Sequence, residues 1–373
     1  MDRYIATPDE LADVARALRA ETLVAVDTEA ASFHKYRDRI YLVQLSTSAE
    51  TFIIDPLPLG DLAPLGELLV DRGVEKVFHD ADYDLRIFDR DYRFRAAHMF
   101  DTRIAAQLIG EPAIGLASLL EKYLGVKLSK EFQKADWSRR PLPPDMLAYA
   151  AADTRHLPAL RERLRERLQA LGRLPWLAEE CVRLEGLRWT GTLDAAEAYL
   201  RIKGAKALAG RQLAALRELY LWRETLAARQ DKAPFRIVGN DVLLAVSRAL
   251  PRTLPALAAT PGVPGSLASR YGPMLLDGVT RALDLDETAL PHVERAPRQP
   301  RDPSFEARVE RLKVARNQAA SALALDPGVL CGRGALEAVA RVRPTDNAEM
   351  EKIGELRRWQ VEVLGTAFLA ALS

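Results

Sequence analysis

A change of pattern near residue 170 constrains the fold of this chain more than any other feature of its sequence. Before it, short runs rich in β-branched and aromatic residues alternate with stretches of helical periodicity. The runs at residues 23–26, 40–45 and 51–54 are typical of three consecutive strands. After residue 170 the apolar residues follow helical spacing. The pattern therefore predicts an α/β domain with a mixed sheet, followed by all-α regions.

Further elements of the α/β domain follow the three strands. "KVFHD" is predicted to be a strand that leads into a helix from about Ala81, and "MFDTRIAAQLI" repeats this strand–helix pattern. Another helix is expected from about Leu62, capped by Asp61. The stretch that begins at Pro143 is predicted to be a long helix, kinked or broken at Pro158 because proline removes a helical hydrogen bond.

The length of 373 residues suits two or three domains. We predict an α/β domain at 1–170, a helical connector at 171–204 and a helical domain at 205–285. A linker at 286–303, rich in proline and charge, precedes a second helical domain at 304–373, and the sequence permits this domain to be a diverged copy of the first. "TPGVPGSLASRYGPMLLDGVTRAL" is expected to hold proline and glycine turns between short helices.

Charge is distributed unevenly along the chain. Residues 1–170 hold 24 Lys and Arg against 28 Asp and Glu, whereas residues 201–285 hold 13 against 6. An acidic module followed by a basic one is consistent with a metal-dependent site and a phosphate-binding accessory. A solvated helical surface would explain the same basic excess.

The cysteines indicate a reducing compartment, and the N-terminal stretch predicts no signal peptide. Cys181 and Cys331 are far apart and have no second cysteine or clustered histidine nearby, so neither a disulfide framework nor a zinc site is predicted. The N-terminal stretch lacks a basic region followed by an apolar one, and no window reaches 18 apolar residues. The expected location is therefore the cytoplasm, without membrane attachment.

The run at residues 23–26 ends in two acids, Asp27 and Glu29. Side chains two residues apart on a strand point to the same side of the sheet, so both carboxylates face one point. Such a pair is mutually repulsive without a cation, and hard divalent ions prefer oxygen ligands. The pair predicts a metal site, and a solvated strand end is the alternative.

A second acidic group lies in "HDADYDL". Asp80 occupies the strand–helix junction and is expected to cap the helix, while Asp82 and Asp84 lie in its first turns, where the macrodipole favours acids. Asp101 in "FDTRIAAQL" is likewise expected to be a cap.

The third feature is "YAAAD". A spacing of four residues on a helix places Tyr149 and Asp153 on one face, one turn apart. The three alanines between them leave room for another element to approach closely. Core packing of the tyrosine is the alternative interpretation.

Together these features resemble the DEDD superfamily of 3′→5′ exonucleases, in its tyrosine-bearing branch. The resemblance extends to the ribonuclease D family through "VDTEAASFHKYRDRIYLVQLS", "HDADYDLRIF", "DWSRRPL" and "YAAADTRHL". "WRETLAARQDKAPFRIVGND" is similar to the helical domain that RecQ helicases share with ribonuclease D. The resemblance covers essentially the whole chain. It implies a ribonuclease H-like mixed sheet with flanking helices, followed by two helical domains of that C-terminal type.

The resemblance also implies residue roles. Asp27, Glu29, Asp84 and Asp153 match the four metal-associated carboxylates, and Tyr149 matches the residue that positions the attacking water. Two Mg²⁺ or Mn²⁺ ions about 4 Å apart would activate water and relieve charge on the leaving 3′ oxygen, with Asp27 expected to bridge them. A neutral tyrosine, with a pKa of about 10, orients water by hydrogen bonding and is a poor base.

Residues that contact substrate are less sharply indicated. In "KEFQKADWSRRPL", Lys130, Gln133 and Arg140 are in a family-like order, and the two cations are candidates for phosphate contact. A loop pinned by Trp137 packing and an Arg140 ion pair is the alternative. Ala30 departs from the family pattern, in which many members carry a bulky apolar residue after D-x-E, so Phe33 is one candidate to wedge against the terminal base.

The favoured hypothesis is a metal-dependent 3′→5′ exoribonuclease that releases nucleoside 5′-monophosphates. By family implication its substrates are structured RNAs with free 3′ ends, such as tRNA precursors. The protein is expected to be a monomer. A 3′→5′ DNA exonuclease is the alternative within enzymes, because nothing in the site forbids deoxyribose. A catalytically silent RNA-binding module is disfavoured because all five active-site matches are intact.

Overall fold

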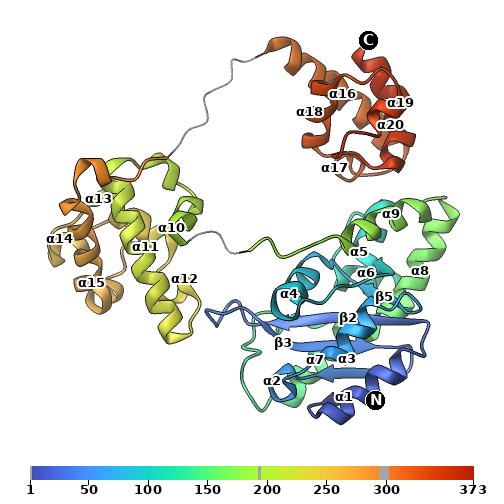
Figure 1. The fold of residues 1–373 in the computed structure, drawn as a ribbon, viewed down its shortest axis with the longest axis horizontal. Helices are drawn as coiled ribbons and strands as arrows, with labels where there is room; N and C mark the ends of the chain where they lie inside the picture. Colours follow the sequence, from blue (N-terminus) through green and yellow to red (C-terminus); the bar gives the residue numbers. More distant parts are fainter. Residues whose placement is uncertain (1, 192–194, 294–301) are drawn as a thin grey trace.

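One mixed sheet organises the N-terminal part of the molecule (Figure 1). The computed structural model describes residues 2–191, 195–293 and 302–373. Within these residues the sheet has the strand order β1-β4-β3-β2-β5-β6. Its strands are β1 (Asp2–Ile5), β2 (Leu23–Ala30), β3 (Ile40–Ser46), β4 (Thr51–Ile54), β5 (Glu75–Phe78) and β6 (Met99–Asp101). The predicted α/β class and mixed sheet are thereby confirmed.

Strand pairing sets the register around the first acidic pair. β2 is antiparallel to β3 and parallel to β5, which places it at the centre of the sheet. Asp27 lies opposite Gln44 of β3, and Glu29 lies opposite Leu42. The edge strand β1, which pairs in parallel with β4, has no counterpart in the sequence analysis. Only Ile5 of its residues is buried, so β1 lacks the apolar run that marks the other strands.

Helices cover both faces of this sheet. They are α1 (Pro8–Leu18), α2 (Pro56–Leu59), α3 (Ala63–Val70), α4 (Asp82–Tyr92), α5 (Thr102–Ile109), α6 (Leu116–Leu124), α7 (Pro144–Arg155), α8 (Leu157–Ala170) and α9 (Leu174–Glu185). Asp61 accepts a hydrogen bond from Ala63 N, the first residue of α3, at 2.8 Å, but it lies one residue before the N-cap, which is Leu62. The predicted break in the long helix is confirmed, because α7 ends at Arg155 and Pro158 lies in the first turn of α8.

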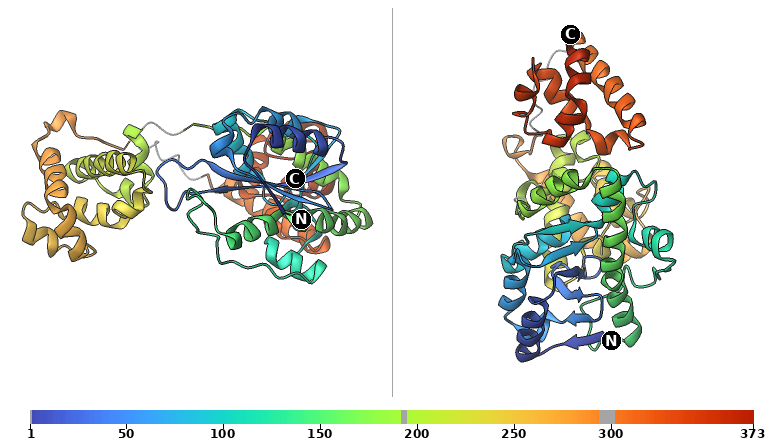
Figure 2. Two further views of the ribbon diagram at one scale, coloured as in Figure 1. Left: turned by 90° about the horizontal axis from the view of Figure 1, so that it is seen from below. Right: turned by 90° about the vertical axis from the view of Figure 1, so that its right-hand side faces the viewer.

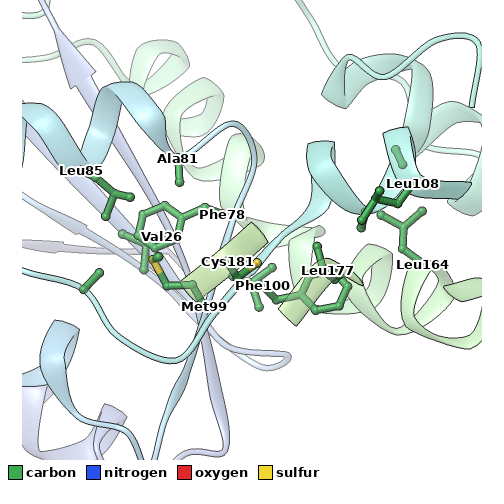
Figure 3. Packing of buried hydrophobic residues seen from close by; sticks show 14 of the residues in the cluster. Val26, Phe78, Ala81, Leu85, Met99, Phe100, Leu108, Leu164, Leu177 and Cys181 are labelled. Atoms are coloured by element: carbon green, nitrogen blue, oxygen red, sulfur yellow. The ribbon is translucent and has the colours of Figure 1, made fainter. Parts of the chain in front are cut away.

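Burial of apolar side chains holds the sheet and helices together (Figure 3). Phe78 of β5 and Phe100 of β6 pack among side chains from β2, α4 and α9 that include Val26, Leu85 and Leu177. Full burial of each such side chain stabilises the fold by roughly 1.5–3 kcal/mol. Cys181 and Cys331 are buried free thiols, in keeping with the expected absence of a disulfide framework. Among the described residues no helix is both long enough and apolar enough to cross a bilayer.

Two helical units repeat the same order of a long, a short, a medium, a short and a long helix. Between α9 and the first unit lie the short elements α10 (Ala195–Ala198), η1 (Tyr199–Arg201) and η2 (Ala205–Ala207), and η3 (Glu287–Ala289) follows that unit. The first helical unit, residues 210–284, contains α11 (Gly210–Gln230), α12 (Pro234–Ile237), α13 (Asn240–Ala249), α14 (Leu254–Ala258) and α15 (Gly265–Asp284). The second helical unit, residues 303–372, contains α16 (Pro303–Ala322), α17 (Pro327–Leu330), α18 (Arg333–Val342), α19 (Asn347–Met350) and α20 (Arg358–Leu372).

The expected turn at Gly272–Pro273 is wrong, because α15 continues through both residues. Packing outweighs the helix-breaking tendency of proline here, since Tyr271 and Leu275 are buried on either side. A Cβ at Gly272 would lie only 2.6 Å from a methyl carbon of Leu254, so the glycine allows α14 to approach α15 closely. Residues 294–301 of the predicted linker and residues 192–194 of the predicted connector lie outside the described residues.

The two helical units contact the α/β domain differently (Figure 2). The loop between β2 and β3 reaches the first helical unit, where Ala233 N donates to His34 O at 3.2 Å. The second helical unit packs on α9, and the rings of Trp176 and Trp359 stack with centroids 4.7 Å apart. Arg173 donates to Leu323 O at 2.8 Å across the same contact.

Candidate active site

Three carboxylates meet on one face of the sheet. Asp27 and Glu29 extend from β2, and Asp153 extends from α7, which packs across β2, β3 and β4. One carboxylate oxygen from each residue lies within 4.8 Å of the others. The three residues are partly buried yet keep some contact with solvent. This arrangement brings together the D-x-E pair and the acid of the YAAAD stretch, as the resemblance implies.

The small residues of α7 allow that close approach. Ala150 and Ala151 are fully buried against the sheet, so no bulky side chain separates the helix from the strands. Thr154 is also buried, and its hydroxyl lies 2.7 Å from the hydroxyl of Ser46 on β3. That hydrogen bond fixes the rotation of α7 one residue after Asp153. The contacts that place α7 on the sheet therefore also place the carboxylate of Asp153.

The fourth acid, Asp84, is buried on α4 and lies outside the three-carboxylate cluster. The hydroxyl of Thr28 donates to Asp84 Oδ1, and Thr28 points to the opposite face of β2 from Asp27 and Glu29. Asp84 is still close enough for its charge to raise the pKa of Asp27 and of Glu29. It therefore lies beside the cluster, held by a threonine that the sequence analysis did not single out.

The electrostatics of these acids favour a bound cation. Burial, followed by the charges of neighbouring acids, raises the pKa values of Asp27 and Glu29 well above their ordinary range. Burial raises the pKa of Asp84 to about 7, and burial also raises the pKa of Asp153 to about 7. Among the described residues no lysine or arginine forms an ion pair with any of the four. Clustered carboxylates without a cationic partner are costly to ionise, and a divalent ion removes that cost.

Tyr149 lies one turn before Asp153 on the same helix. Its ring packs edge-on against Phe132, with centroids 5.7 Å apart, and is tilted against Trp137 at 6.1 Å. Burial, followed by the charge of Asp153, raises the pKa of Tyr149 and keeps its hydroxyl neutral. A cavity of about 300 Å³ adjoins Tyr149 and Asp153 and is lined on its other side by Lys127, Leu128, Ser129, Glu131 and Phe132.

The expected capping role of Asp80 is wrong. Asp80 has a φ of +70° and pairs with Arg103, and among the described residues no side chain caps the N-terminus of α4. Asp101 accepts instead from the backbone N–H groups of Asp80 and Ala81, the latter at 2.8 Å. The cap predicted at Asp101 is confirmed, since its carboxylate also accepts from the first turn of α5. The last residue of β6 thus binds the backbone just before α4 but does not cap the helix itself.

The loop of candidate substrate contacts borders the site. Lys130 and Gln133 are exposed, whereas Trp137 is buried. Arg140 donates to Asp55 Oδ1 at 2.9 Å and to the carbonyl oxygens of Tyr41 and Trp137. These contacts support the interpretation in which Arg140 and Trp137 pin the loop. Phosphate contact by Lys130, Gln133 or Arg140 stays a prediction.

One buried polar residue was missed entirely. Gln44 lies opposite Asp27 on β3, is fully buried, and has no hydrogen-bond partner for either amide atom among the described residues. Its only sequence signal is a polar residue within the otherwise apolar strand "IYLVQLS". Thr28, between the two acids of β2, was also missed, and it has no sequence signal of its own.

The donor set fits hard divalent ions. Carboxylate oxygens are the ligands that Mg²⁺ and Mn²⁺ prefer, and the cluster offers no thiol or imidazole that would favour softer ions. Asp27, Glu29 and Asp153 would hold one ion, and Asp84 would add a ligand for a second. A neutral phenol next to such a site can orient a water molecule by hydrogen bonding. This combination suits metal-assisted hydrolysis of a phosphodiester.

Comparison with protein families agrees with this geometry. Residues 3–169 match a family model described as a 3′-5′ exonuclease. Residues 212–279 and, separately, 305–372 match the model of the HRDC domain. The second match supports the repeated helix order of the two helical units as two copies of one domain.

Individual relatives extend the similarity over the whole chain. A ribonuclease D of Gluconacetobacter diazotrophicus is 35% identical over 80% of this chain and 76% of the relative. A ribonuclease D of Granulibacter bethesdensis is 32% identical over 98% of this chain and 91% of the relative. The crystal structure of Escherichia coli RNase D, described as an exoribonuclease involved in structured RNA processing, is 28% identical. It covers 100% of this chain and 98% of that structure, with a TM-score of 0.72.

Proposed function

Because this chain belongs to the ribonuclease D family and is a 3′-5′ exoribonuclease, we propose that it acts by two-metal-ion hydrolysis at the carboxylate cluster. Each cycle would release one nucleoside 5′-monophosphate from an RNA 3′ end. The observation that carries this proposal is the convergence of Asp27, Glu29 and Asp153 beside Tyr149. Two elements far apart in the sequence build that convergence.

The residues divide the chemistry between them. Asp27, Glu29, Asp84 and Asp153 would hold two divalent ions, Mg²⁺ or Mn²⁺. When bound, such ions lower the pKa of water and stabilise charge on the leaving oxygen. Tyr149 would orient the attacking water through its neutral hydroxyl, without accepting the proton. The cavity beside Tyr149 gives the terminal nucleotide room next to these groups.

The substrate is RNA, and we propose structured RNAs such as tRNA precursors as its class. Two observations support this: the similar Escherichia coli RNase D is involved in structured RNA processing, and residues 201–285 hold 13 Lys and Arg against 6 Asp and Glu. The cations of residues 201–285 lie outside the α/β domain that holds the carboxylates. They would bind phosphates of the RNA without recognising its base sequence. Lys130, Gln133 and Arg140 stay candidates for phosphate contact nearer the cut. We further propose a monomer in the cytoplasm, divided into domains at residues 170, 204, 285 and 303.

Removing one ligand at a time tests the proposed site. We expect Asp27→Asn and Asp153→Asn to abolish Mg²⁺-dependent and Mn²⁺-dependent release of mononucleotides from a 3′-labelled RNA. RNA affinity and the circular dichroism spectrum should stay close to those of the unmodified chain, since neither residue is a buried apolar contact. Metal affinity should fall at least 10- to 100-fold, because loss of groups that merely support ligands already reaches that range.

Two neighbouring acids on α4 provide a matched control. Asp84→Asn should lower activity strongly, whereas Asp82→Asn should not, because Asp82 is exposed and paired with Arg86. Full activity of both Asp27→Asn and Asp153→Asn would contradict the assignment of the metal site.

A further inference from the structure

Two exposed aromatic rings from distant parts of the chain meet near the active site. Phe33, in the loop that follows β2, lies edge-to-face against Phe235 of α12, with centroids 6.0 Å apart and planes at 78°. The pair stays open to solvent, because Phe33 is 44% exposed and Phe235 is 53% exposed. Contact between the rings therefore leaves about half of their surface uncovered.

Hydrogen bonds on either side hold this pair in place. Ala233 N donates to His34 O, and the amine of Lys35 lies 2.9 Å from a carboxylate oxygen of Asp231. His34 Nε2 lies 2.8 Å from Lys134 O. The loop is thus fastened to the first helical unit and to the segment that contains Lys134. Both rings are presented by anchored backbone, which lowers the entropic cost of binding a flat ligand.

Positive charge accompanies the rings. The amine of Lys134 lies 5.4 Å from the centroid of the Phe33 ring. Arg236, next to Phe235, is exposed, as is Lys134. Among the described residues neither forms an ion pair with a carboxylate. Exposed aromatic rings accompanied by unpaired cations are the pattern by which proteins bind single-stranded nucleic acid.

The rings also lie close to the chemistry. Phe33 follows Glu29 by four residues. Lys134 follows Phe132 by two residues, and the Phe132 ring packs against Tyr149. A strand whose 3′ end reaches the carboxylates therefore has its preceding nucleotides within reach of this surface.

We propose that Phe33 and Phe235 form a stacking site for a nucleobase of the RNA strand upstream of the nucleotide being removed. Lys134 and Arg236 bind the phosphates that flank this base. This inference rests on the proposed function, because it requires an RNA 3′ end at the carboxylate cluster. Stacking on aromatic rings contributes about 1–3 kcal/mol per base and tolerates all four bases, as an exonuclease requires.

Leucine and tryptophan substitutions distinguish stacking of a nucleobase on the two rings from a mere contact between the loop and the first helical unit. Phe33→Leu and Phe235→Leu keep an apolar side chain but remove the flat face, whereas Phe33→Trp and Phe235→Trp enlarge it. Affinity for a fluorescein-labelled ten-nucleotide oligoadenylate is measured in EDTA, where no cleavage occurs. We expect each leucine variant to bind about 5- to 150-fold more weakly, the factor that corresponds to loss of one stacked base. The tryptophan variants should bind within about threefold of the unmodified chain.

Val342→Ala is the control, since it trims an exposed apolar side chain on α18 of the second helical unit and leaves both rings and their anchoring contacts. Its affinity for the oligoadenylate should change by less than about threefold, because exposed substitutions away from a binding site have small effects. Unchanged affinity in both leucine variants would overturn the proposal, and so would an equal loss in Val342→Ala. Failure of the proposed function would look different, because the unmodified chain would then release no mononucleotides with Mg²⁺ or Mn²⁺.

A second inference comes independently from Gln44. Its side chain is 0% exposed, and neither Nε2 nor Oε1 has a partner among the described residues. Leaving a buried donor or acceptor unpaired costs about 1–3 kcal/mol. Gln44 and Asp27 are directly opposite on antiparallel strands, so their side chains share the face that α7 covers.

We propose that Gln44 is a positioning residue whose Nε2–H donates to a carboxylate oxygen of Asp27 when that residue holds a divalent ion. Cross-strand neighbours have Cβ atoms about 4.5–5.5 Å apart, a span that a glutamine side chain bridges. Hydrogen bonds to a ligand fix its orientation and strengthen metal binding. The Gln44 amide, which is unpaired here, would then gain its hydrogen-bond partner when the metal binds.

Gln44→Met tests this role because methionine has a similar shape without the amide. We expect Mn²⁺ affinity, measured by isothermal titration calorimetry, to fall about 10- to 100-fold, as for other groups that support ligands. In EDTA the melting temperature of the variant should equal or exceed that of the unmodified chain, because an unpaired buried amide has been removed. Unchanged Mn²⁺ affinity, or a lower melting temperature in EDTA, would contradict the proposal.

Discussion

The two helical units have one fold and different surroundings. Both match the HRDC model and share the order of five helices. Residues 201–285, which include the first unit, hold 13 Lys and Arg against 6 Asp and Glu, whereas residues 301–373 hold 11 against 10. The first unit contacts the α/β domain through the loop after β2, and the second contacts α9 through stacked tryptophans. The first unit thus contacts the loop that follows the acidic pair of β2, and the second unit is packed on α9.

A single equivalent position shows how the copies diverge. α12 reads Pro-Phe-Arg-Ile and α17 reads Pro-Gly-Val-Leu, so Phe235 of the first unit corresponds to Gly328 of the second. The fold of the unit does not require an aromatic residue there, since the second unit forms without one. Phe235 is therefore best explained by what it contacts outside its own unit. Substitutions in the first unit should change RNA binding, and substitutions in the second should change stability.

Beyond the carboxylate substitutions, the largest effect is expected outside both helical units, at Tyr149. Tyr149→Phe should lower kcat by about 10²- to 10⁴-fold, the contribution usual for a positioned group that handles a proton, with little change in RNA affinity. No substitution that we describe in the helical units should lower the rate at saturating RNA by more than a few-fold. Single-turnover rates measured for Tyr149→Phe and for the variants in the helical units test both expectations. A change confined to KM would make Tyr149 a packing or substrate-contact residue.

In the second unit, Trp359→Ala should cost about 3–5 kcal/mol of unfolding free energy, as expected for truncation of a buried tryptophan. Trp359 is 3% exposed, stacks on Trp176, and donates from Nε1 to Glu180 at 3.0 Å. Phe235→Ala in the first unit should change unfolding free energy by less than about 1 kcal/mol, because its side chain is largely exposed. Urea denaturation compares the two, and equal losses would remove the distinction between the units.

Charge substitutions sharpen the comparison further. The double variant Lys232→Gln and Arg236→Gln should weaken binding of a folded tRNA. The slope of log affinity against log salt concentration should become shallower by about 0.7–0.9 for each phosphate contact that is lost. Lys232 and Arg236 are exposed on the first unit, and Arg343 and Lys352 are exposed on the second. The matched variant Arg343→Gln and Lys352→Gln should leave affinity and slope unchanged. Equal slopes for the unmodified chain and both double variants would show that the excess of Lys and Arg in residues 201–285 is only a solvated surface.

The smallest effect is expected for the ion pair between Lys35 and Asp231. Both side chains are partly or largely exposed, so Lys35→Ala should cost less than about 1 kcal/mol of unfolding free energy. A double-mutant cycle with Asp231→Ala isolates the pair. A coupling energy well above that value would show that this contact, more than the aromatic pair, joins the loop to the first unit.

Much of the site could be predicted because its signals are local. Asp27 and Glu29 are two residues apart on a strand, and Tyr149 and Asp153 are four residues apart on a helix, so each spacing places its pair on one face. The alanines between Tyr149 and Asp153 are buried against the sheet, as close approach requires. The α/β class followed from the change of period near residue 170.

Prediction fails where distant segments meet. Asp101 accepts from the backbone N–H groups of Asp80 and Ala81, just before α4, because β5 and β6 are parallel neighbours and end side by side. Gln44 carries no local signal beyond its polarity, and its importance appears only through the register with Asp27. The turn expected at Pro273 is wrong because local propensity cannot show that α14 packs against α15 at Gly272. The pairing of Phe33 with Phe235 joins residues about 200 positions apart.

The central claim is that cleavage occurs at the carboxylates on β2 and α7, whereas the first helical unit acts on RNA binding. The most direct test measures, for one oligoadenylate, both the dissociation constant in EDTA and the single-turnover rate at saturating enzyme with Mn²⁺. Asp27→Asn should lose the rate and keep the dissociation constant. Phe235→Leu should weaken binding and keep the rate at saturation. A Phe235→Leu rate as low as that of Asp27→Asn, or a full rate in Asp27→Asn, would contradict the account.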